Sequence, residues 1–352
     1  MKKRPVKLSD VARAAKVSTA TVSRALSLPH LVKPDTRARI ERAVNELSYI
    51  AHGTARALAS RRSRTVGAVI PTLYNAIFAN TTHALQKTLD DAGYALVLAF
   101  HEFDPNNELR LARTLIERGI DGIVLVGTEH HAGLFELIRA MQIPYVLTWA
   151  LDRTGRHPCV GFDNRHAAVM LTNHLLDLGH TEIAMISGLT AHNERARERL
   201  QGVREAMAAR GLSLPRERLT ERPYTLSSGR AGLAALMRTK PRPTAVICGN
   251  DVLAIGAIAE CKELGVELPH EVSITGFDDM EISSLIGPGL TTVHFPTGEM
   301  GRIGSIMLLA LISGAPVSRC HELPVRLVVR GTTAPPLAGA PRREQLTRIA
   351  GD

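Results

Sequence analysis

The sequence has few cysteines and none of the spacings that build metal sites. Its four cysteines, in 352 residues, stand far apart, with no CxxC pair and no histidine at a metal-ligand spacing. We therefore expect small buried thiols and neither a metal nor another cofactor. The four are Cys159, Cys248, Cys261 and Cys320.

Long apolar runs are missing as well. A bilayer span needs about 20 consecutive apolar residues, and no stretch of the chain reaches that length. The N-terminus carries Lys2, Lys3 and Arg4 but no apolar segment behind them, so it lacks the pattern of a secretory signal. These absences predict a cytoplasmic protein without a membrane partner.

Signatures of the common α/β enzymes do not occur. No GxGxxG follows the first predicted strand, and there is no GxxxxGK[ST] phosphate loop. No HExxH or Ser–His–Asp signature appears, and the GPG at 287–289 is typical of a turn. We therefore expect no catalytic residues. An α/β enzyme stays the less favoured alternative, because it would give the basic N-terminal block no function.

Positive charge is concentrated at the N-terminus. Residues 1–64 contain 15 Lys and Arg against only four acidic residues, although the whole chain has a net charge of +9. The rest of the chain therefore carries slightly more acidic than basic groups. A basic block beside a near-neutral body is the electrostatic footprint of a segment that binds phosphate. This distribution predicts a nucleic-acid partner.

Residues 7–26, KLSDVARAAKVSTATVSRAL, have the pattern of two short helices joined by a tight turn. Ser9 is placed to cap the first helix and Ser18 the second, in which Val22 and Leu26 face a core. The first helix has an apolar face of Val11, Ala12 and Ala15. Such a unit places its second helix in the major groove of DNA, whereas a helical hairpin that only packs is the alternative. The residues expected to contact DNA are Ser18, Thr19, Ala20, Thr21, Ser23 and Arg24.

A third helix is predicted for residues 35–48, where apolar residues recur at helical spacing behind Pro34. We assign residues 1–48 to a three-helix head. Residues 49–64 contain a short alanine-rich stretch that would be unstable as an isolated helix in water. This segment is therefore either a linker or a hinge helix that forms only against a partner.

From Val66 the pattern changes to alternating strands and helices. Short β-branched runs predict buried parallel strands at 66–71, 94–100, 121–127, 143–149, 159–163, 183–187, 244–249 and 272–278. Helices are expected near 76–92, 106–118, 164–178, 196–210, 227–238 and 251–264. Glycines that can end a helix in the left-handed conformation stand at Gly93, Gly119, Gly179, Gly211 and Gly265. The repeat predicts doubly wound parallel sheets in a two-lobed α/β body.

The body is assigned to residues 65–335. One lobe takes about 65–161 and 293–322, and the other about 162–292 and 323–335. The last segment, 336–352, is rich in Pro, Gly, Ala and Arg, and we expect it to be disordered.

Taken together, these segments resemble the lactose-repressor/galactose-repressor family of bacterial transcription factors. Besides the head, the body repeats phrases of that family: VGFDN (160–164), GHTEIAMISG (179–188), RLQG (199–202), AVICGNDVLAIGA (245–257), VSITGFDD (272–279) and LTTVHFP (290–296). The resemblance implies a body like the periplasmic sugar-binding proteins and a repressor that binds pseudo-palindromic operator DNA. It implies a homodimer, because no leucine heptad that would tether a tetramer ends the chain. A free sugar-binding transport protein would share the body but would need a signal peptide.

The resemblance also places a small-molecule effector between the lobes, and it allows either induction or co-repression. The matching positions are Phe78, Asn193, Arg195, Arg199, Tyr224, Asn250 and Asp278. Trp149 could stack on a sugar face, or could equally belong to the core. The stretches 70–79 and 160–168 look closest to repressors of gluconate and related sugar-acid genes. Two arginines would suit such an anion, so we expect a sugar acid, with a neutral sugar as the alternative.

Family hinge helices insert a leucine into the minor groove at the centre of the operator. Leu58 matches that leucine, and Ala55 is one of its small neighbours, which are also expected at the DNA. The chain departs from the family at three places, one of which is Lys33, where a serine cap is common. Ala51 and His52 replace the usual Pro-Asn pair, and Lys16 stands where many members have glycine.

Overall fold

The computed structural model describes residues 4, 6–27, 29–49, 62–73 and 76–337. The predicted hinge helix, with Ala55 and Leu58, lies outside the described residues, and so does most of the predicted C-terminal tail. The chain divides into a small N-terminal head and a much larger body.

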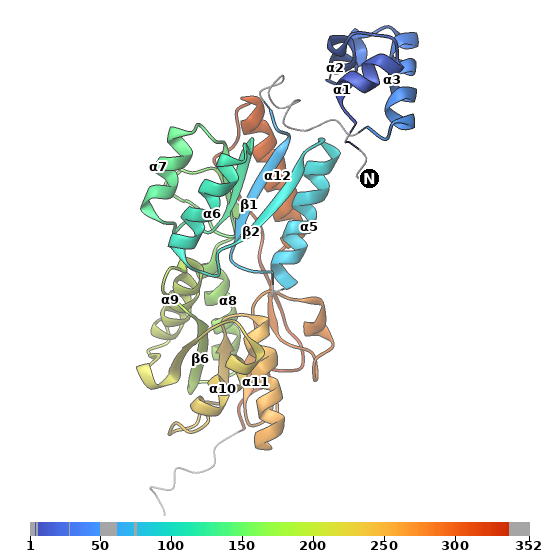
Figure 1. Cartoon of the computed structure of the whole chain (residues 1–352). Coiled ribbons are helices and arrows are strands. Elements are labelled where there is room, and N and C mark those ends of the chain that lie inside the picture. Colours follow the sequence, from blue (N-terminus) through green and yellow to red (C-terminus); the bar gives the residue numbers. More distant parts are fainter. Residues whose placement is uncertain (1–3, 5, 28, 50–61, 74–75, 338–352) are drawn as a thin grey trace, which may run out of the picture. The chain divides into compact units, whose positions relative to one another are not determined.

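The head is a bundle of three helices (Figure 1). They are α1 (Leu8–Ala14), α2 (Thr19–Ser27) and α3 (Pro34–Glu46), with one 3-10 turn at Pro29–Leu31. Val11, Val22 and Ile40 supply one side chain from each helix to the head core, and each is at most 1% exposed. Pro34 occupies the first turn of α3, where its missing N–H costs no hydrogen bond. The predicted three-helix head is confirmed.

The start of α1 differs from the prediction. The backbone N–H of Lys7 donates to Asp10 Oδ2 at 2.9 Å, so the helix begins at Leu8 and Ser9 lies inside it. Asp10 replaces Ser9 in this role because a carboxylate is the stronger acceptor and also favours the positive end of the helix dipole.

The turn and the second helix start as the sequence predicts. Ser18 Oγ accepts a hydrogen bond from the backbone N–H of Thr21 at 3.1 Å, which caps α2. Lys16, in the turn before it, has a φ of 53°, a conformation that costs glycine nothing. This explains why a glycine would be common at that position.

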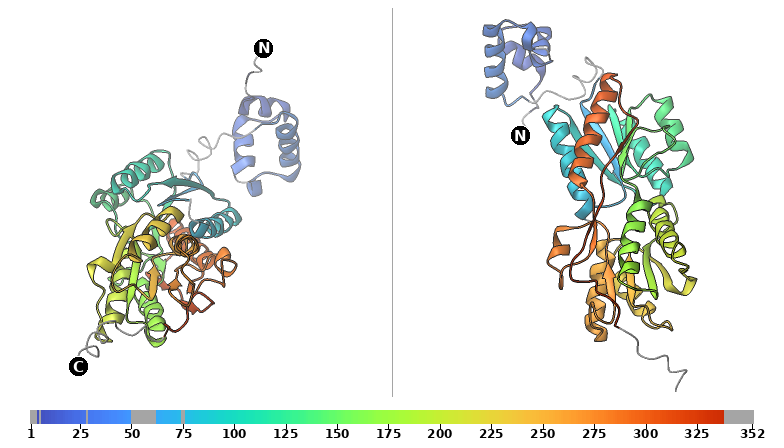
Figure 2. Two further views of the ribbon diagram at one scale, coloured as in Figure 1. Left: turned by 90° about the horizontal axis from the view of Figure 1, so that it is seen from below. Right: turned by 180° about the vertical axis from the view of Figure 1, so that it is seen from behind.

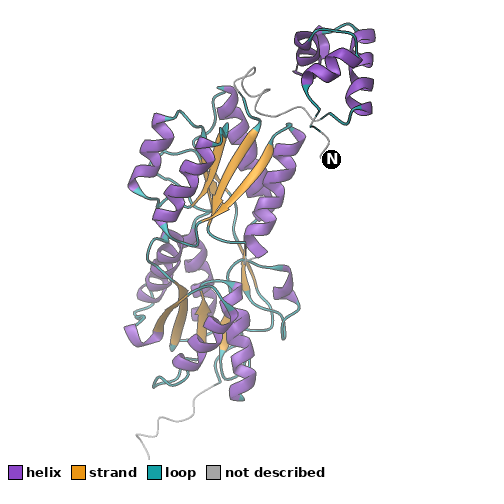
Figure 3. Cartoon of the chain, in the orientation of Figure 1, coloured by secondary structure: helices purple, strands orange, loops and turns teal. Residues whose placement is uncertain are grey.

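The first lobe of the body is a six-stranded sheet in the order β11-β5-β4-β3-β1-β2. Its strands are β1 (Thr65–Ile70), β2 (Ala95–Phe100), β3 (Gly122–Val126), β4 (Tyr145–Thr148), β5 (Cys159–Gly161) and β11 (Cys320–Glu322). Two helices, α5 (Ala76–Asp91) and α12 (Thr297–Ser313), pack together on one face, and α6 (Pro105–Glu117) and α7 (Ala132–Ala140) on the other (Figures 1 and 3). The central strand β3 is buried throughout, as a strand covered on both faces should be.

The second lobe repeats the same design with a four-stranded parallel sheet in the order β7-β6-β8-β9. The strands are β6 (Ile183–Gly188), β7 (Leu219–Arg222), β8 (Ala245–Cys248) and β9 (Ser273–Thr275). The helices are α8 (Asn164–Asp177) with α9 (Glu194–Ala208), and α10 (Leu226–Leu236) with α11 (Asp251–Leu264); the members of each pair pack together. The predicted two-lobed α/β body is confirmed.

The chain passes between the lobes three times. The first crossing leads from β5 into α8, and the second leads from β10 (Thr292–His294) into α12. The third returns from β11 to β12 (Arg326–Val328), which pairs antiparallel with β10. Figure 2 shows this last segment, in dark red, running from one lobe to the other. Each lobe is therefore built from segments that lie far apart in the sequence.

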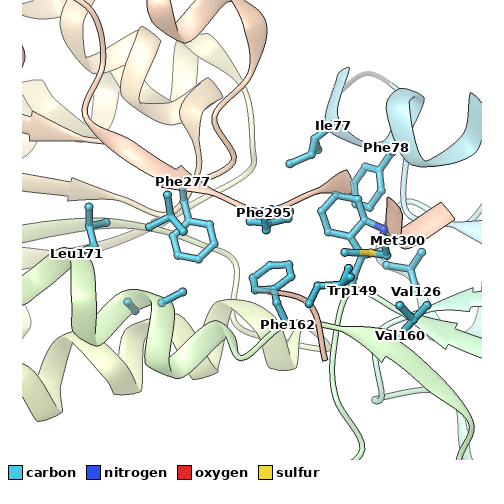
Figure 4. Packing of buried hydrophobic residues seen from close by; sticks show 14 of the residues in the cluster. Ile77, Phe78, Val126, Trp149, Val160, Phe162, Leu171, Phe277, Phe295 and Met300 are labelled. Carbon is cyan, nitrogen blue, oxygen red and sulfur yellow. The ribbon is translucent and has the colours of Figure 1, made fainter. Parts of the chain in front are cut away.

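Aromatic rings fill the junction between the lobes (Figure 4). Phe162 and Phe295, which lie on two of the crossings, stack with centroids 3.9 Å apart. Phe277 lies 6.0 Å from Phe295 on one side, and Trp149 lies 5.8 Å from it on the other. Phe78 continues the row into the first lobe, 4.8 Å from Trp149. The junction thus has a continuous hydrophobic core.

Several local predictions can be compared with the structure. The five glycines expected at helix ends all have positive φ, between 65° and 96°. The expectation of four buried cysteines is wrong for Cys320, because the edge strand β11 leaves it exposed. The sequence patterns missed α7, β7, α12 and the short strands β10 to β12. Among the described residues, no helix is long and apolar enough to cross a membrane.

Candidate functional site

A pocket lies between the lobes, where the strands of both sheets end. It contains about 390 Å³ of empty space, part of it open to solvent. Its lining residues follow the carboxyl ends of strands, which is where open α/β sheets bind ligands. They are Ile77, Phe78, Phe103, Trp149, Asn193, Arg195, Arg199, Tyr224, Asn250 and Asp278.

All eight residues that the sequence proposed for an effector line this one pocket. The structure adds Ile77, which precedes Phe78 on α5, and Phe103, which follows β2. Phe103 has the same relation to its strand as Asp278 has to β9, so the position of strand ends could have identified it. Ile77 has no separate signal in the sequence.

Arg199 is held in the pocket by several partners. Its Nε donates to Asn164 Oδ1 at 2.8 Å, and its Nη1 donates to the Gly249 carbonyl at 2.6 Å. The guanidinium carbon lies 3.8 Å from the centroid of the Phe277 ring, in a cation–π contact. These contacts fix the plane of the guanidinium and leave further N–H groups for other acceptors.

Asp278 faces Arg199 across 3.9 Å, and both side chains are buried. Burial raises the pKa of the Asp278 carboxyl well above its usual value, and the nearby guanidinium opposes this effect only partly. The residue also has a φ of 132°, which L-amino acids rarely adopt. Strain of this kind persists where the surroundings enforce it and gathers at functional positions.

Two asparagines begin helices at the pocket. Asn193 Oδ1 accepts from the Ala196 N–H at 3.3 Å, and Asn250 Oδ1 accepts from the Leu253 N–H at 2.9 Å. The N-termini of α9 and α11 therefore meet at the pocket, where their dipoles favour negative charge. Asn193 caps α9, so Arg195 lies in the first turn of that helix. The sequence had predicted the helix to start near residue 196 and had placed Arg195 in the preceding loop.

Two buried donors at the pocket have no hydrogen-bond acceptor within the described part of the chain. They are Trp149 Nε1 and Arg195 Nε. The nearest ionic partner of Arg195 is Glu194 Oε1, at 3.7 Å. A buried donor without an acceptor costs free energy, so each of these N–H groups would gain from a ligand oxygen in the pocket.

The lobes touch directly beside the pocket. Glu194 Oε1 on α9 accepts from the backbone N–H of Thr128 in the first lobe at 2.8 Å. Arg197, one turn further along α9, forms an ion pair with Glu129 at 2.5 Å. A Cβ on Gly127 would lie 2.5 Å from Glu194 Oε1, so only glycine permits this approach. We call these contacts the interlobe latch.

The head displays the predicted second helix with its polar face outward. Thr19, Ala20, Ser23 and Arg24 are exposed, whereas Val22 faces the core. Ser18 and Thr21 hydrogen-bond to each other at the start of α2. Small exposed residues followed by an arginine permit close approach to base edges.

Comparison with known proteins agrees with this architecture. Residues 7–52 match the model of bacterial regulatory proteins of the lacI family, and residues 172–333 match a periplasmic binding protein-like domain. The catabolite control protein A of Priestia megaterium is 30% identical over 93% of this chain and 99% of its own length. The transcriptional regulator GntR of Escherichia coli K12 is 34% identical over 90% of this chain and 95% of its own.

Solved structures show the same fold. A lac repressor dimer bound to operator and an anti-inducer has a TM-score of 0.84 at 28% identity, and covers 94% of this chain and all of that chain. The regulator GntR from Chromobacterium violaceum has a TM-score of 0.73 at 31% identity, and covers 76% of this chain and 99% of that chain.

A basic helix-turn-helix head joined to a two-lobed body with a pocket at its strand ends defines a ligand-responsive transcription regulator. Relatives at these identities extend over nearly the whole chain. The chain belongs to the lacI family of bacterial regulatory proteins. The resemblance predicted from the sequence is confirmed.

Proposed function

We propose that this regulator represses carbohydrate catabolic genes from the cytoplasm, and that a sugar acid bound in the interlobe pocket controls its hold on operator DNA. It acts by binding and not by catalysis. The observation that carries the proposal is the convergence of Arg195, Arg199 and two helix N-termini on one small pocket. Cationic groups and helix dipoles together favour an anion.

The buried donors sharpen the choice of ligand. Trp149 Nε1 and Arg195 Nε have no acceptor among the described residues, and a carboxylate brings two oxygen atoms. Asp278 and Asn250 are suited to the hydroxyl groups of a sugar chain. A neutral sugar stays the second candidate, because hydroxyl oxygens also accept hydrogen bonds.

Titration calorimetry with gluconate and with glucose tests the ligand class. We expect saturable binding of the acid, and we expect Arg199→Lys to abolish it, because an ammonium group cannot reproduce a bidentate contact. Operator binding by this variant should persist, since Arg199 lies in the body. Arg204→Gln, on the same helix but exposed, is the matched control. Binding of glucose alone would refute the sugar-acid part, and a normal response of Arg199→Lys would refute the site.

For the head, we propose that Thr19, Ala20, Ser23 and Arg24 read operator bases. Arg24→Ala should relax the sequence preference at one position of each half-site, where a good arginine–guanine pair is worth about 1–3 kcal/mol. Binding to a randomised operator library measures this change. A uniform loss over all sequences would instead make Arg24 a phosphate contact.

We further propose a homodimer that uses the free edge of the first sheet. Strand β2 is the last strand in the order of this sheet and forms its edge. It is apolar along its length, and Val97 is 41% exposed and Phe100 38% exposed. An exposed apolar edge is a template for pairing with a second chain. Val97→Asp should shift the protein to monomers in analytical ultracentrifugation and should weaken binding to the full operator.

A further inference from the structure

Phe103 lies at the mouth of the pocket, opposite a ring from the other lobe. It belongs to the first lobe, in the loop that connects β2 to α6. Its ring centroid lies 6.1 Å from that of Tyr224, which follows β7 in the second lobe. Both side chains line the pocket and both are half-buried, as expected at an entrance. The two rings therefore face each other across the cleft.

The loop that carries Phe103 is strained but firmly attached. Glu102 and Phe103 have φ values of 52° and 63°, which are uncommon for residues with a side chain. The backbone N–H of Glu102 donates to the Pro71 carbonyl at 2.9 Å, and that of His101 donates to the Ile70 carbonyl at 3.1 Å. Strain of this kind is found where surrounding structure imposes it, often at ligand clamps. The loop therefore presents Phe103 in one defined position.

In the second lobe, Tyr224 occupies space that Gly188 leaves free. A Cβ on Gly188 would lie 2.1 Å from Tyr224 Oη, so a glycine is required there for the tyrosine to occupy its place. Gly188 is the last residue of β6, and Tyr224 follows β7, the strand paired with it. The two rings, with centroids 6.1 Å apart, thus set the width of this opening.

Behind the rings the pocket is small. Part of its 390 Å³ of empty space is open to solvent, so the space enclosed behind the rings is smaller than that figure. Phe78 and Trp149 form an inner aromatic wall, and Arg199 is held in place by its own partners. A ligand longer than one sugar unit would therefore have to extend beyond this pocket, either outward between Phe103 and Tyr224 or past Ile77 and Asp278 into a neighbouring hollow that also contains Asp279 and Glu281.

We propose that Phe103 and Tyr224 form an aromatic gate that limits this regulator to effectors of one sugar unit. The gate excludes a ligand extended by a second unit, whereas the charged residues behind it orient the first. This inference rests on the proposed function, because it assumes that a sugar acid or sugar enters the pocket.

One test needs no ligand, because Trp149 is the only tryptophan of the chain and lines the pocket behind the gate. Trp149 is 3% exposed, so acrylamide should quench its fluorescence poorly in the full-length wild-type protein. In Phe103→Ala, we expect the quenching constant to rise severalfold, because the mouth widens. Met141→Ala, which removes an exposed apolar side chain of the same lobe away from both the pocket and the β2 edge, should leave the quenching constant unchanged. A circular-dichroism melt checks that both variants fold.

The second test compares gluconate with maltobionate, which is gluconate extended by one glucose unit, by titration calorimetry. Wild type should bind gluconate and reject maltobionate, and Phe103→Ala should bind both. Binding of maltobionate by wild type, or its continued rejection by a Phe103→Ala protein that binds gluconate, overturns the gate. If wild type binds no sugar or sugar acid at all, the proposed function fails, and unchanged quenching in Phe103→Ala would overturn the gate independently.

Discussion

The two lobes contribute different chemistry to one pocket. The first lobe supplies only apolar side chains, namely Ile77, Phe78, Phe103 and Trp149. The second lobe supplies nearly all the polar ones, namely Asn193, Arg195, Arg199, Asn250 and Asp278, together with Tyr224. The polar wall can orient a ligand by many hydrogen bonds, whereas the apolar wall mainly covers it and offers a single donor, Trp149 Nε1. We infer that the second lobe selects the ligand and that the first lobe closes on it.

This division of roles explains why the two walls are supported differently. Arg199 is fixed within the second lobe, by hydrogen bonds to Asn164 and Gly249. Trp149 and Phe78 of the first lobe instead join the row of rings that fills the junction. A movement of the lobes would therefore change the apolar wall more than the polar one. A ligand shifts the lobe equilibrium only by the contacts that differ between the two arrangements.

The largest expected effect comes from the polar wall. Arg199→Met should lower the free energy of unfolding by about 4 kcal/mol, because it removes the guanidinium that opposes the raised pKa of Asp278, and the buried carboxyl must then take up a proton or stay charged without a partner. Adding Asp278→Asn to that variant should restore part of the stability, since the unpaired charge is then gone, but it should not restore ligand binding. Urea denaturation measures the first quantity and calorimetry the second. Equal stability of the single and double variants would contradict the pairing.

A second comparison concerns one buried histidine in each lobe. His101 in the first lobe has no hydrogen-bond partner for either ring nitrogen among the described residues, and burial lowers its pKa to about 4. His180 in the second lobe is bonded to Thr244 and to the Ala334 carbonyl. The unfolded chain takes up a proton at this histidine near pH 6.5, whereas the folded chain does so only near pH 4. The free energy of unfolding is therefore unaffected by the titration of His101 above pH 6.5 and falls as the pH drops toward 4.

Between pH 7 and pH 4 the free energy of unfolding should fall by about 3 kcal/mol, because the pKa of His101 lies about 2.5 below that of the unfolded chain. His101→Gln should remove this part of the pH dependence, and urea midpoints across the range measure it. His180→Gln is the comparison in the other lobe: burial lowers the pKa of His180 too, but this variant also removes two hydrogen bonds, so unlike His101→Gln it should lower the free energy of unfolding at neutral pH. A parallel pH profile of wild type and His101→Gln would contradict the assignment.

The interlobe latch tests whether closure and ligand binding are coupled. Glu194→Gln weakens the charge-assisted hydrogen bond to Thr128, which should lower ligand affinity about tenfold, or about 1.4 kcal/mol. Gly127→Ala should have a similar effect by collision with Glu194. Calorimetric titration with the effector measures both variants. Unchanged affinity in the two variants would show that the latch has no part in closure.

The smallest effect is expected from the apolar wall. Phe78→Leu keeps most of the hydrophobic surface but removes the ring that lies 4.8 Å from Trp149. An aromatic pair contributes about 1 kcal/mol beyond its area, so we expect roughly fivefold weaker ligand binding. If Phe78→Leu lowered ligand affinity as much as Arg199→Met does, the division of roles between the walls would be wrong.

The sequence predicted the parts of the fold that local patterns determine. Continuous β-branched runs identified eight strands, and Gly119 or Gly265 ended helices where only a glycine tolerates positive φ without cost. The missed strands β10 to β12 have three residues each and, unlike the equally short β5 and β9, were not marked by a buried apolar run; β11, for example, is exposed throughout. Helix α12 was missed although it is long, because its mostly apolar sequence lacks a clear polar face.

The site was predicted where residue type carries a chemical signal. Arginine, aspartate and asparagine at strand ends indicated the polar wall, and the family phrases aligned them. Phe103 stands at a strand end as Asp278 does, but its residue type carries no chemical signal, and its role becomes visible only when the opposite lobe shows Tyr224 facing it. The sequence could not predict the interlobe latch either, because Thr128 and Glu194 are brought together only by tertiary structure.

The discontinuous first lobe has a consequence for synthesis of the protein. A nascent chain that has emerged from the ribosome as far as Pro296 exposes nearly all of the second lobe, but the first lobe still lacks α12 and β11. The surface that Met300 and Leu308 cover in the finished protein, where both are fully buried, then stays open to solvent. Nascent chains stalled just before this point should therefore recruit chaperones or aggregate, although the lobe made later in the sequence has already formed.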